Sequence, residues 1–358
     1  MTDLPRTGRR SLLAMLTTLP AAMRAGTLLG APPPPTLAAP FSETPRLLVA
    51  GPADGALNRW ADALLPALEQ SLPPDTAIRR IEIGSADGVT GANQFEARGA
   101  PDGQTVLLVP GQAALAWLVG DPRAQFDVGH WVPVMAGANS AIVLGRPTVL
   151  APDGRARVAA AGPASFDLAA LLGIHLLGAR MEPVFGLLEP DAANSAFAQG
   201  AVDAVLLRGH GVPAQLIALA AAGAQPLFAL GAIDAGGRAT RDPRFPEVPH
   251  FAELYASRTG SMPSGPLFDA WCAAAAAAQL AFGLMLPQLT PAAMVALWRR
   301  AGVDAVAVPG VQATAATVNV RPLTGLTAAA NTAVIAVGAP ALEELRRWLA
   351  SRFNWRPA

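Results

Sequence analysis

The sequence contains no lysine, a single cysteine and few charged residues. All 26 basic residues are arginines, and 26 acidic residues balance them. The net charge is therefore zero, and no basic cluster predicts binding to nucleic acid. The lone cysteine, Cys272, excludes an internal disulfide and a cysteine-based metal cluster. It lies in an alanine-rich run that is typical of a helix, and we interpret it as a buried apolar residue rather than a nucleophile.

Sequence motifs of common enzymes are also missing. There is no Gly-x-Ser-x-Gly elbow, Walker loop or HExxH motif. The four histidines lack the spacing of metal ligands. We therefore expect no catalytic residue, no metal site and no cofactor. Because 52% of the residues are hydrophobic and only 15% are charged, the composition excludes disorder and favours a well-buried α/β protein.

The first 39 residues have the order of an export signal. Arg9 and Arg10 precede a mostly apolar run that Pro20 and Arg24 interrupt, so we expect no permanent membrane span. The paired arginines indicate the twin-arginine route, and a proline-rich linker follows at 31–40. A disordered basic tail is the alternative. Removing residues 1–39 takes away four arginines and one aspartate, which leaves a net charge near −3.

Strand, loop and helix signals alternate along the chain after this segment. Apolar runs at 47–50, 78–83 and 105–109 each lead into a glycine-containing loop and a helical pattern. This alternation predicts lobes with a mainly parallel sheet between helices. Since ligands of such sheets bind at the carboxyl ends of the strands, the loops 51–58, 86–90 and 110–112 should meet at one edge.

The same cycle restarts further along the chain. Strands are expected at 158–161, 202–207 and 226–230, and long helices at 267–286, 291–301 and 341–353. We therefore divide the chain into an export segment and linker (1–39), lobe I (40–144 and 262–358) and lobe II (145–261).

Five segments, in order, resemble the substrate-binding proteins of tripartite tricarboxylate transporters, also called the Bug family. They are RLLVAGPADGALNR from Arg46, GANQFEARGAPDGQTVLL from Gly91, Gln125–Val134, Gly200–Asp203 and Asp242–Glu253. The resemblance covers roughly residues 45 to 257.

This resemblance implies a periplasmic, two-lobed binding protein of the type II (Venus flytrap) architecture. Members of the family are not enzymes. They capture small organic acids in a cleft and deliver them to membrane transporter subunits or to a sensor, and we expect a monomer. The loops of the first lobe hold the ligand carboxylate, largely through backbone groups and waters, and the second lobe closes by a hinge motion.

Transferred to this sequence, the resemblance and the loop pattern give fourteen candidate ligand-binding residues. Asp54 stands where the family usually has glycine, Asn58 where it has aspartate, and Gln104 where it has tyrosine. The candidates are Pro52, Asp54, Gly55, Asn58, Asp87, Gly88, Thr90, Pro110, Gly111, Gln112, Gly162, Ala164, Ser165 and Arg208.

Several of these residues have a second interpretation. Asp54 suits the N-cap of the following helix, and a ligand contact is the alternative. Ser165 likewise suits a helix cap or a ligand contact. Arg208 suits a two-bond grip on a carboxylate, or a solvated or salt-bridged arginine at the surface. The segment Asn194-Ser195 suits a surface turn or a cleft contact.

Two other functions stay open at this point. Gly209-x-Gly211-x-x-Ala214 has the spacing of a dinucleotide fingerprint, which would make the protein an NAD(P)-dependent oxidoreductase. The acidic residue that such a site needs is not evident, since Asp234 follows in a loop. A receptor-like interaction module without a ligand is the third hypothesis, and its cleft should be filled by its own side chains.

Overall fold

The computed structural model describes residues 41–151 and 154–355. The expected export segment and its linker lie outside the described residues. No helix in the described ranges is long and apolar enough to cross a membrane.

The first lobe is built on a six-stranded sheet. Its strands β1, β2 and β3 pair in parallel, whereas β4, β12 and β13 join through antiparallel pairs. The sheet is therefore mixed, and only its N-terminal half has the parallel pairing that the alternation predicts. In spatial order the strands are β13 (Val320–Thr324), β4 (Trp131–Asn139), β12 (Leu280–Pro287), β3 (Thr105–Val109), β1 (Arg46–Ala50) and β2 (Arg79–Ile83).

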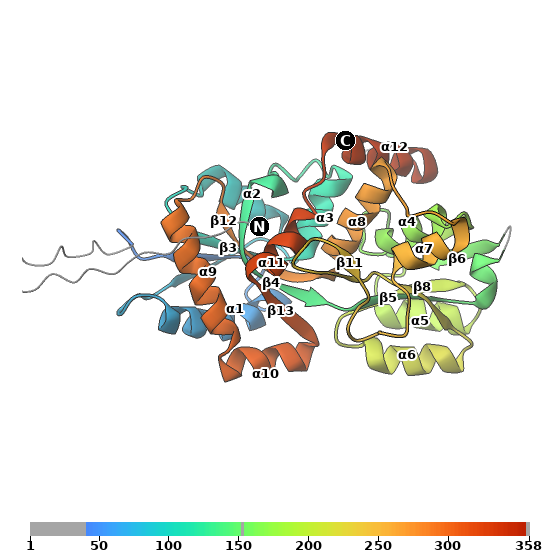
Figure 1. Ribbon diagram of the computed structural model, residues 1–358, viewed down its shortest axis with the longest axis horizontal. Coiled ribbons are helices and arrows are strands. Elements are labelled where there is room, and N and C mark those ends of the chain that lie inside the picture. The colour runs from blue at the N-terminus through green and yellow to red at the C-terminus, as the bar shows by residue number, and fades with distance from the viewer. Residues whose placement is uncertain (1–40, 152–153, 356–358) are drawn as a thin grey trace, which may run out of the picture. The chain divides into compact units, whose positions relative to one another are not determined.

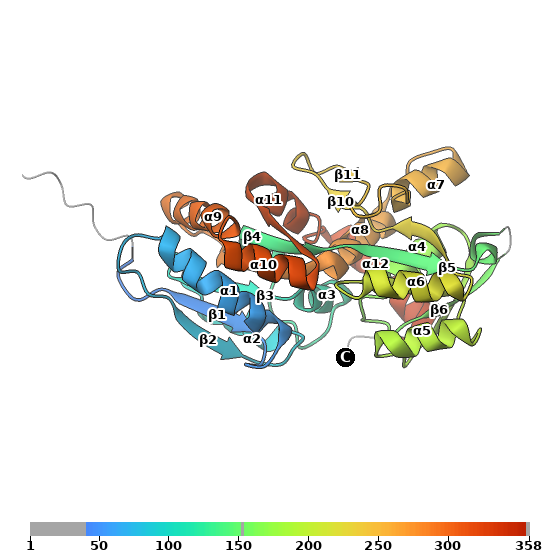
Figure 2. The ribbon, with the colours of Figure 1, turned by 90° about the horizontal axis from the view of Figure 1, so that it is seen from below.

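Helices cover both faces of this sheet. Leu47 and Val49 of β1 pack into one buried cluster, whereas Leu48 and Ala50 pack into another. Successive side chains of a strand point to opposite faces, so this division shows that both faces are buried. On one face α1, α9 and α10 lie side by side (Figure 2). The helices of this lobe are α1 (Ala56–Ser71), α2 (Val89–Arg98), α3 (Gly111–Val119), η1 (Val128–His130), α9 (Ala292–Val306), α10 (Pro309–Val318) and α11 (Gly325–Ala333).

The second lobe has a five-stranded sheet, also mixed. Strand β6 pairs in parallel with β7 and β8, and β5 is antiparallel to β8 and β9. The order is β7 (Arg180–Val184), β6 (Arg155–Ala159), β8 (Ala204–Arg208), β5 (Ala141–Gly145) and β9 (Gln225–Ala229). The other elements are η2 (Pro147–Leu150), α4 (Leu168–Leu176), α5 (Pro190–Ala198), α6 (Val212–Ala221), the hairpin of β10 (Ala232–Ile233) and β11 (Ala239–Thr240), and α7 (Phe251–Thr259).

The chain first crosses between the sheets at Ser140. Strand β4 ends at Asn139 in the first sheet, and β5 begins at Ala141 in the second. The change of sheet thus precedes position 144, where the sequence placed the end of the first part of lobe I. Ser140 is buried and donates a hydrogen bond to the Asp242 carboxylate at 2.9 Å.

Helix α8 (Pro266–Gln279) connects the two lobes. It packs against α3 of the first lobe, α4 of the second and α12 (Ala339–Phe353) (Figure 1). The predicted helix 267–286 is wrong over 280–286, because α8 ends at Gln279 and the residues from Leu280 form β12. Paired with β3 and β4, β12 completes the centre of the first sheet, and this long-range pairing overrides the local helical pattern.

Candidate ligand-binding site

A cavity of about 370 Å³ lies where loops of both lobes meet the crossing segments. The first lobe contributes the loop after β1 and the start of α3, and the second contributes residues at the end of β8. All three loops that should share one edge reach it, through Pro52, Ala86 and Gly111 among others. Its wall contains Gly51, Pro52, Gly55, Ala56, Leu57, Arg59, Trp60, Ala86, Pro110, Gly111, Gln112, Asn139, Phe166, Pro190, Arg208, Gly209, His210, Leu280, Ala281, Val318 and Val320.

The β1–α1 loop is held from within by Asn58. Its amide nitrogen donates a hydrogen bond to the carbonyl oxygen of Pro52, and its amide oxygen accepts one from Arg80. The side chain is buried and does not line the cavity. Asn58 therefore shapes the loop and presents Pro52 and Gly55 to the cavity.

Asp54 does not cap α1, and it does not line the cavity. The N-cap of α1 is Gly55, and no side chain caps this helix. Asp54 is exposed and is not among the residues that line the cavity. The cap interpretation is wrong because the chain turns into the helix one residue later, at Gly55, whose N–H bonds to the Pro52 carbonyl. The carboxylate consequently places no negative charge in the cavity wall.

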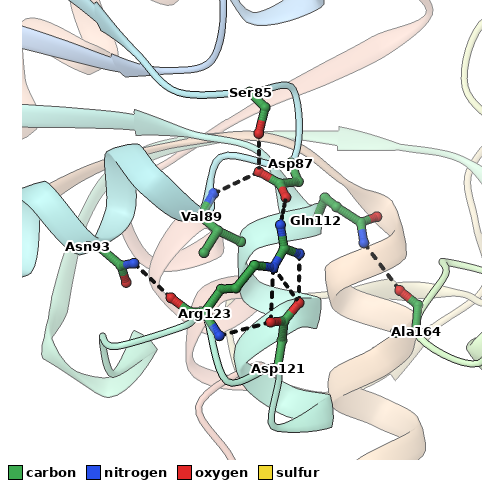
Figure 3. A network of polar contacts seen from close by, with 8 residues as sticks. All are labelled: Ser85, Asp87, Val89, Asn93, Gln112, Asp121, Arg123 and Ala164. Carbon is green, nitrogen blue, oxygen red and sulfur yellow. Dashed lines mark hydrogen bonds and ion pairs between the residues drawn. The ribbon is translucent and has the colours of Figure 1, made fainter. Parts of the chain in front are cut away.

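Asp87 and Gly88 fix the neighbouring loop. One Asp87 oxygen accepts hydrogen bonds from the Ser85 hydroxyl (2.9 Å) and the Val89 N–H (3.2 Å) (Figure 3). The other accepts one from Arg123 at 2.9 Å, and Arg123 also pairs with Asp121. This pairing lowers the pKa of Asp121 below its ordinary value.

Gly88 is required where this loop meets the start of α3. Its φ of 74° lies in the left-handed region, and a Cβ would come within 2.5 Å of the Pro110 ring. Thr90 lies exposed in the first turn of α2. Asp87, Gly88 and Thr90 do not line the cavity.

Helix α3 begins in the wall of the cavity. A Cβ on Gly111 would lie 2.1 Å from the Ala277 carbonyl oxygen, so only glycine lets the helix start this close to α8. The next residue, Gln112, donates a hydrogen bond from its amide nitrogen to the Ala164 carbonyl oxygen at 3.2 Å (Figure 3). This bond joins the two lobes at the edge of the cavity.

Arg208 projects from the end of β8 into the cavity. Its guanidinium carbon lies 3.7 Å from the centre of the Phe166 ring, which is the geometry of a cation–π contact. The side chain is open to the cavity but flanked by protein, and desolvation lowers its pKa to about 10. It remains charged at neutral pH, and in the described residues no carboxylate forms an ion pair with it. The salt-bridge interpretation is therefore wrong, whereas the exposure of Arg208 agrees with a solvated side chain.

A second cavity of about 570 Å³ adjoins the first on the lobe II side. The two cavities share Gln112, Phe166, Pro190 and Arg208. Gly162, Ala164 and Ser165 line the second one only. Asn194 also lines it, from within α5, so this residue lies in a helix and not in a turn.

Ser165 does not cap α4, because the residue at the N-cap position is Asp167. The Ser165 hydroxyl lies 2.8 Å from both the Gly162 carbonyl oxygen and Asp167 Oδ2. The Ala161 N–H donates to the same Asp167 oxygen at 2.9 Å. Burial nevertheless raises the pKa of Asp167 above its ordinary value. Ser165 therefore holds the loop together beside the cavity.

Arginines are the charged side chains that line the first cavity. Arg59 and Arg208 line it, and no aspartate or glutamate of the described residues does. The helices α1 and α3 both begin at its wall, at Ala56 and Gly111. The first N–H groups of a helix lack acceptors within the helix and carry partial positive charge, so both helix starts favour an anion.

Of the fourteen candidates, nine line one cavity or both, and five do not. Those outside are Asp54, Asn58, Asp87, Gly88 and Thr90. The sequence missed Phe166, which directly follows the expected loop, and Arg59 and Trp60 in the first turns of α1. It also missed Leu280 and Val320, for which no local signal exists, because they come from β12 and β13 and reach the cavity only through sheet pairing.

The fingerprint-like segment does not form a dinucleotide site. Such a site needs a second parallel strand next to the first, with an acidic residue at its end. After α6 the chain enters β9, which β5 separates from β8. Asp234 instead accepts hydrogen bonds from the backbone N–H groups of Gly236 and Arg238 in the β10–β11 turn.

Cys272 and His175 are both partly shielded in packed regions. Burial raises the pKa of the Cys272 thiol to about 12, as suits a packing residue. His175 is half-buried and lies 5.5 Å from the Trp348 ring, and desolvation lowers its pKa.

No protein-family model and no curated protein matches the chain. Among solved structures, a TctC solute-binding protein from Polaromonas, described as holding no ligand, is similar with a TM-score of 0.62. The two are 17% identical, and the match covers 86% of this chain and 98% of the other. The periplasmic binding protein BugD is 14% identical, with a TM-score of 0.46 and 86% and 97% covered. MatC from Rhodopseudomonas palustris, solved with malate, is 20% identical, with a TM-score of 0.46 and 85% and 97% covered.

Proposed function

We propose that this chain, which has the two-lobed α/β fold of a TctC solute-binding protein, binds a small organic carboxylate between its lobes. The TctC likeness agrees in fold with the Bug-family resemblance of the sequence motifs, and we take the chain to be a divergent member of that family. In this proposal it is exported to the periplasm, works as a monomer and delivers its ligand to membrane transporter subunits or a sensor.

One observation carries the proposal: the first cavity has two arginines and two helix starts in its wall, and no carboxylate from the described residues. An anion is therefore attracted from several directions at once. The cavity volume of about 370 Å³ suits a small molecule. Because the chain's own side chains leave this space free, the feature expected of a ligand-free module is missing.

Arg208 is the residue that we expect to bind the carboxylate from lobe II. Its planar guanidinium can donate two parallel hydrogen bonds to a carboxylate. Phe166 holds it at the cavity by stacking, and no described carboxylate competes for it through an ion pair. The first residues of α1 and α3, Ala56 and Gly111, line the same cavity from lobe I. A bound carboxylate would thereby connect the two lobes.

The test is a calorimetric titration of the protein, produced from Phe41 onward, with a panel of aliphatic, aromatic and hydroxy carboxylates. We expect at least one acid to bind, and Arg208→Gln to weaken it about 10- to 100-fold, since hydrogen bonds to charged groups are worth about 1.5–3 kcal/mol. The control is Arg238→Gln, which removes the same charge from an exposed turn outside both cavities. Absence of binding across the panel, or equal affinity of both variants, would refute the proposal.

A further inference from the structure

A third cavity, of about 370 Å³, is formed by the first lobe alone. It lies where α11 packs on β4 beside α9 (Figure 2). Every described residue in its wall comes from the first lobe, and Leu280 is the one that it shares with the first cavity. An occupant of this cavity would therefore not touch the second lobe.

The wall of the third cavity is mostly apolar. Trp131 is held in place by the Phe126 ring, which stacks on it with 5.3 Å between the ring centroids. Helix α11 presents small side chains, among them Ala329 and Ala333, which share one side of the helix because they are four residues apart. They leave open the space that longer side chains would fill. The large apolar side chains of the wall are all buried, and they are Val128, Trp131, Leu280, Met285 and Ile335.

Among the described residues, Arg299 is the only charged one in this wall. Strand β13 pairs with β4 only from Met135 onward, so Pro133 lies at an open edge of the sheet. There Nε of Arg299 donates a hydrogen bond to the Pro133 carbonyl oxygen at 3.0 Å, which holds the guanidinium at the cavity. Nη1 and Nη2 form no hydrogen bond with a described residue, and neither is sealed off from solvent. Both nitrogens can therefore donate to an anion.

The wall offers few other polar side-chain groups. The Thr332 hydroxyl lies 3.0 Å from the Ala328 carbonyl oxygen and 3.1 Å from that of Ala329, within its own helix. Nε1 of Trp131 is shielded from any occupant. A ligand with several polar groups would lose hydrogen bonds to water without replacing them. A ligand with one anionic group and an apolar body avoids this cost and gains from burial of its apolar surface.

We propose that the third cavity binds the anion of a medium-chain fatty acid, with its carboxylate at Nη1 and Nη2 of Arg299 and its alkyl chain between β12, Trp131 and α11. A guanidinium matches a carboxylate through two parallel hydrogen bonds. Met285 has a flexible side chain that can adapt to the alkyl chain. The volume lies near the lower end of the range for small-molecule sites. This site is independent of the one proposed between the lobes, since it needs neither Arg208 nor lobe II.

The test compares ligands that share an alkyl chain and differ in charge. The protein is titrated calorimetrically with decanoate, decanol and decyltrimethylammonium, each below its micelle-forming concentration. We expect decanoate to bind about tenfold or more tightly than the other two, and Arg299→Gln to weaken it about 10- to 100-fold. The matched control is Arg300→Gln, which removes an exposed charge from the same helix outside the wall and should change nothing. Absence of decanoate binding, or equal affinity for decanol, would overturn the inference.

A further variant separates this site from the space between the lobes. Arg208→Gln should leave decanoate binding unchanged. If Arg208→Gln weakens it and Arg299→Gln does not, decanoate binds between the lobes, so this inference fails while the proposed function stands.

Two more measurements locate the alkyl chain. Ala329→Phe fills the cavity while Arg299 stays in place, so it should abolish binding of decanoate; thermal unfolding verifies its fold. Decanoate brominated at its terminal carbon should quench tryptophan fluorescence more in the wild type than in Trp131→Phe, because Trp131 lines the cavity. Unchanged binding in Ala329→Phe, or equal quenching in Trp131→Phe, would place the chain elsewhere and overturn the inference.

Discussion

Gly88 links two loops of the candidate site, and we predict that Gly88→Ala destabilises the protein by about 2–5 kcal/mol. Its φ of 74° lies in the left-handed region, which costs an L-residue roughly 1–2 kcal/mol. The new Cβ would also stand 2.5 Å from Cδ of Pro110 and 3.3 Å from the Ala50 carbonyl oxygen. The proline ring cannot rotate away, so the loop must shift, at a typical overpacking cost of about 1–3 kcal/mol.

Urea denaturation followed by tryptophan fluorescence measures this loss. The matched control is Gly325→Ala, also in the first lobe, because Gly325 has a φ of 56° but nothing within 4 Å of its Cβ position. The control should lose only the backbone part, roughly 1–2 kcal/mol. Equal losses in the two variants would refute the reasoning, since the contact with Pro110 would then carry no cost. A second consequence follows for the cavity: displacing Pro110 should weaken ligand binding in Gly88→Ala and leave it unchanged in the control.

The remaining predictions concern three other positions. Asn58→Asp should destabilise the protein by about 1–3 kcal/mol in urea, because a carboxylate cannot donate the hydrogen bond to the Pro52 carbonyl; unchanged stability would exclude this role. Arg157 holds the pKa of Asp203 below its ordinary value, so this stabilisation is present above the unfolded pKa and is lost as the pH falls through the folded one. Melting temperatures should therefore fall more steeply below about pH 4 in the wild type than in Asp203→Asn. Cys272 should react with a maleimide at pH 8 only after unfolding, since its thiol pKa of about 12 leaves little thiolate; rapid labelling of the native protein would contradict this.

The sequence predicted the strands of the first lobe correctly where an apolar run is closed by a turn residue. The runs 47–50 and 105–109 are continuous, apolar and closed by Gly51 and Pro110, and they became β1 and β3, buried on both faces. It failed at 280–287, where an equally apolar run follows α8 without a turn signal. Nothing local distinguishes a buried strand from a continuing buried helix there. The sheet decides, because β12 fills the place between β3 and β4.

For the site, the sequence predicted which loops meet but not which side chains face the cavity. The order of strand and loop is enough to bring Pro52 and Gly111 to one edge. The direction of a side chain within a loop depends on single hydrogen bonds. Asn58 turns inward because the Pro52 carbonyl and Arg80 both bind its amide, and these partners are visible only in the folded chain.

In the first loop, Asp54 and Asn58 differ from the Bug-family pattern that the sequence resembles. Neither residue lines the cavity, so these two differences alter the charge of its wall less than the residue types suggest. A glycine-to-aspartate change at Asp54 should repel an anion, but the residue is exposed and lies outside the cavity wall. An aspartate-to-asparagine change at Asn58 removes a charge that would in any case be buried within the loop. On the opposite side of the cavity, Arg208 stacks on Phe166 and supplies a positive charge from lobe II. Under the proposed function, recognition of the carboxylate should therefore depend on Arg208 of lobe II more than on Asp54 and Asn58 of the first loop.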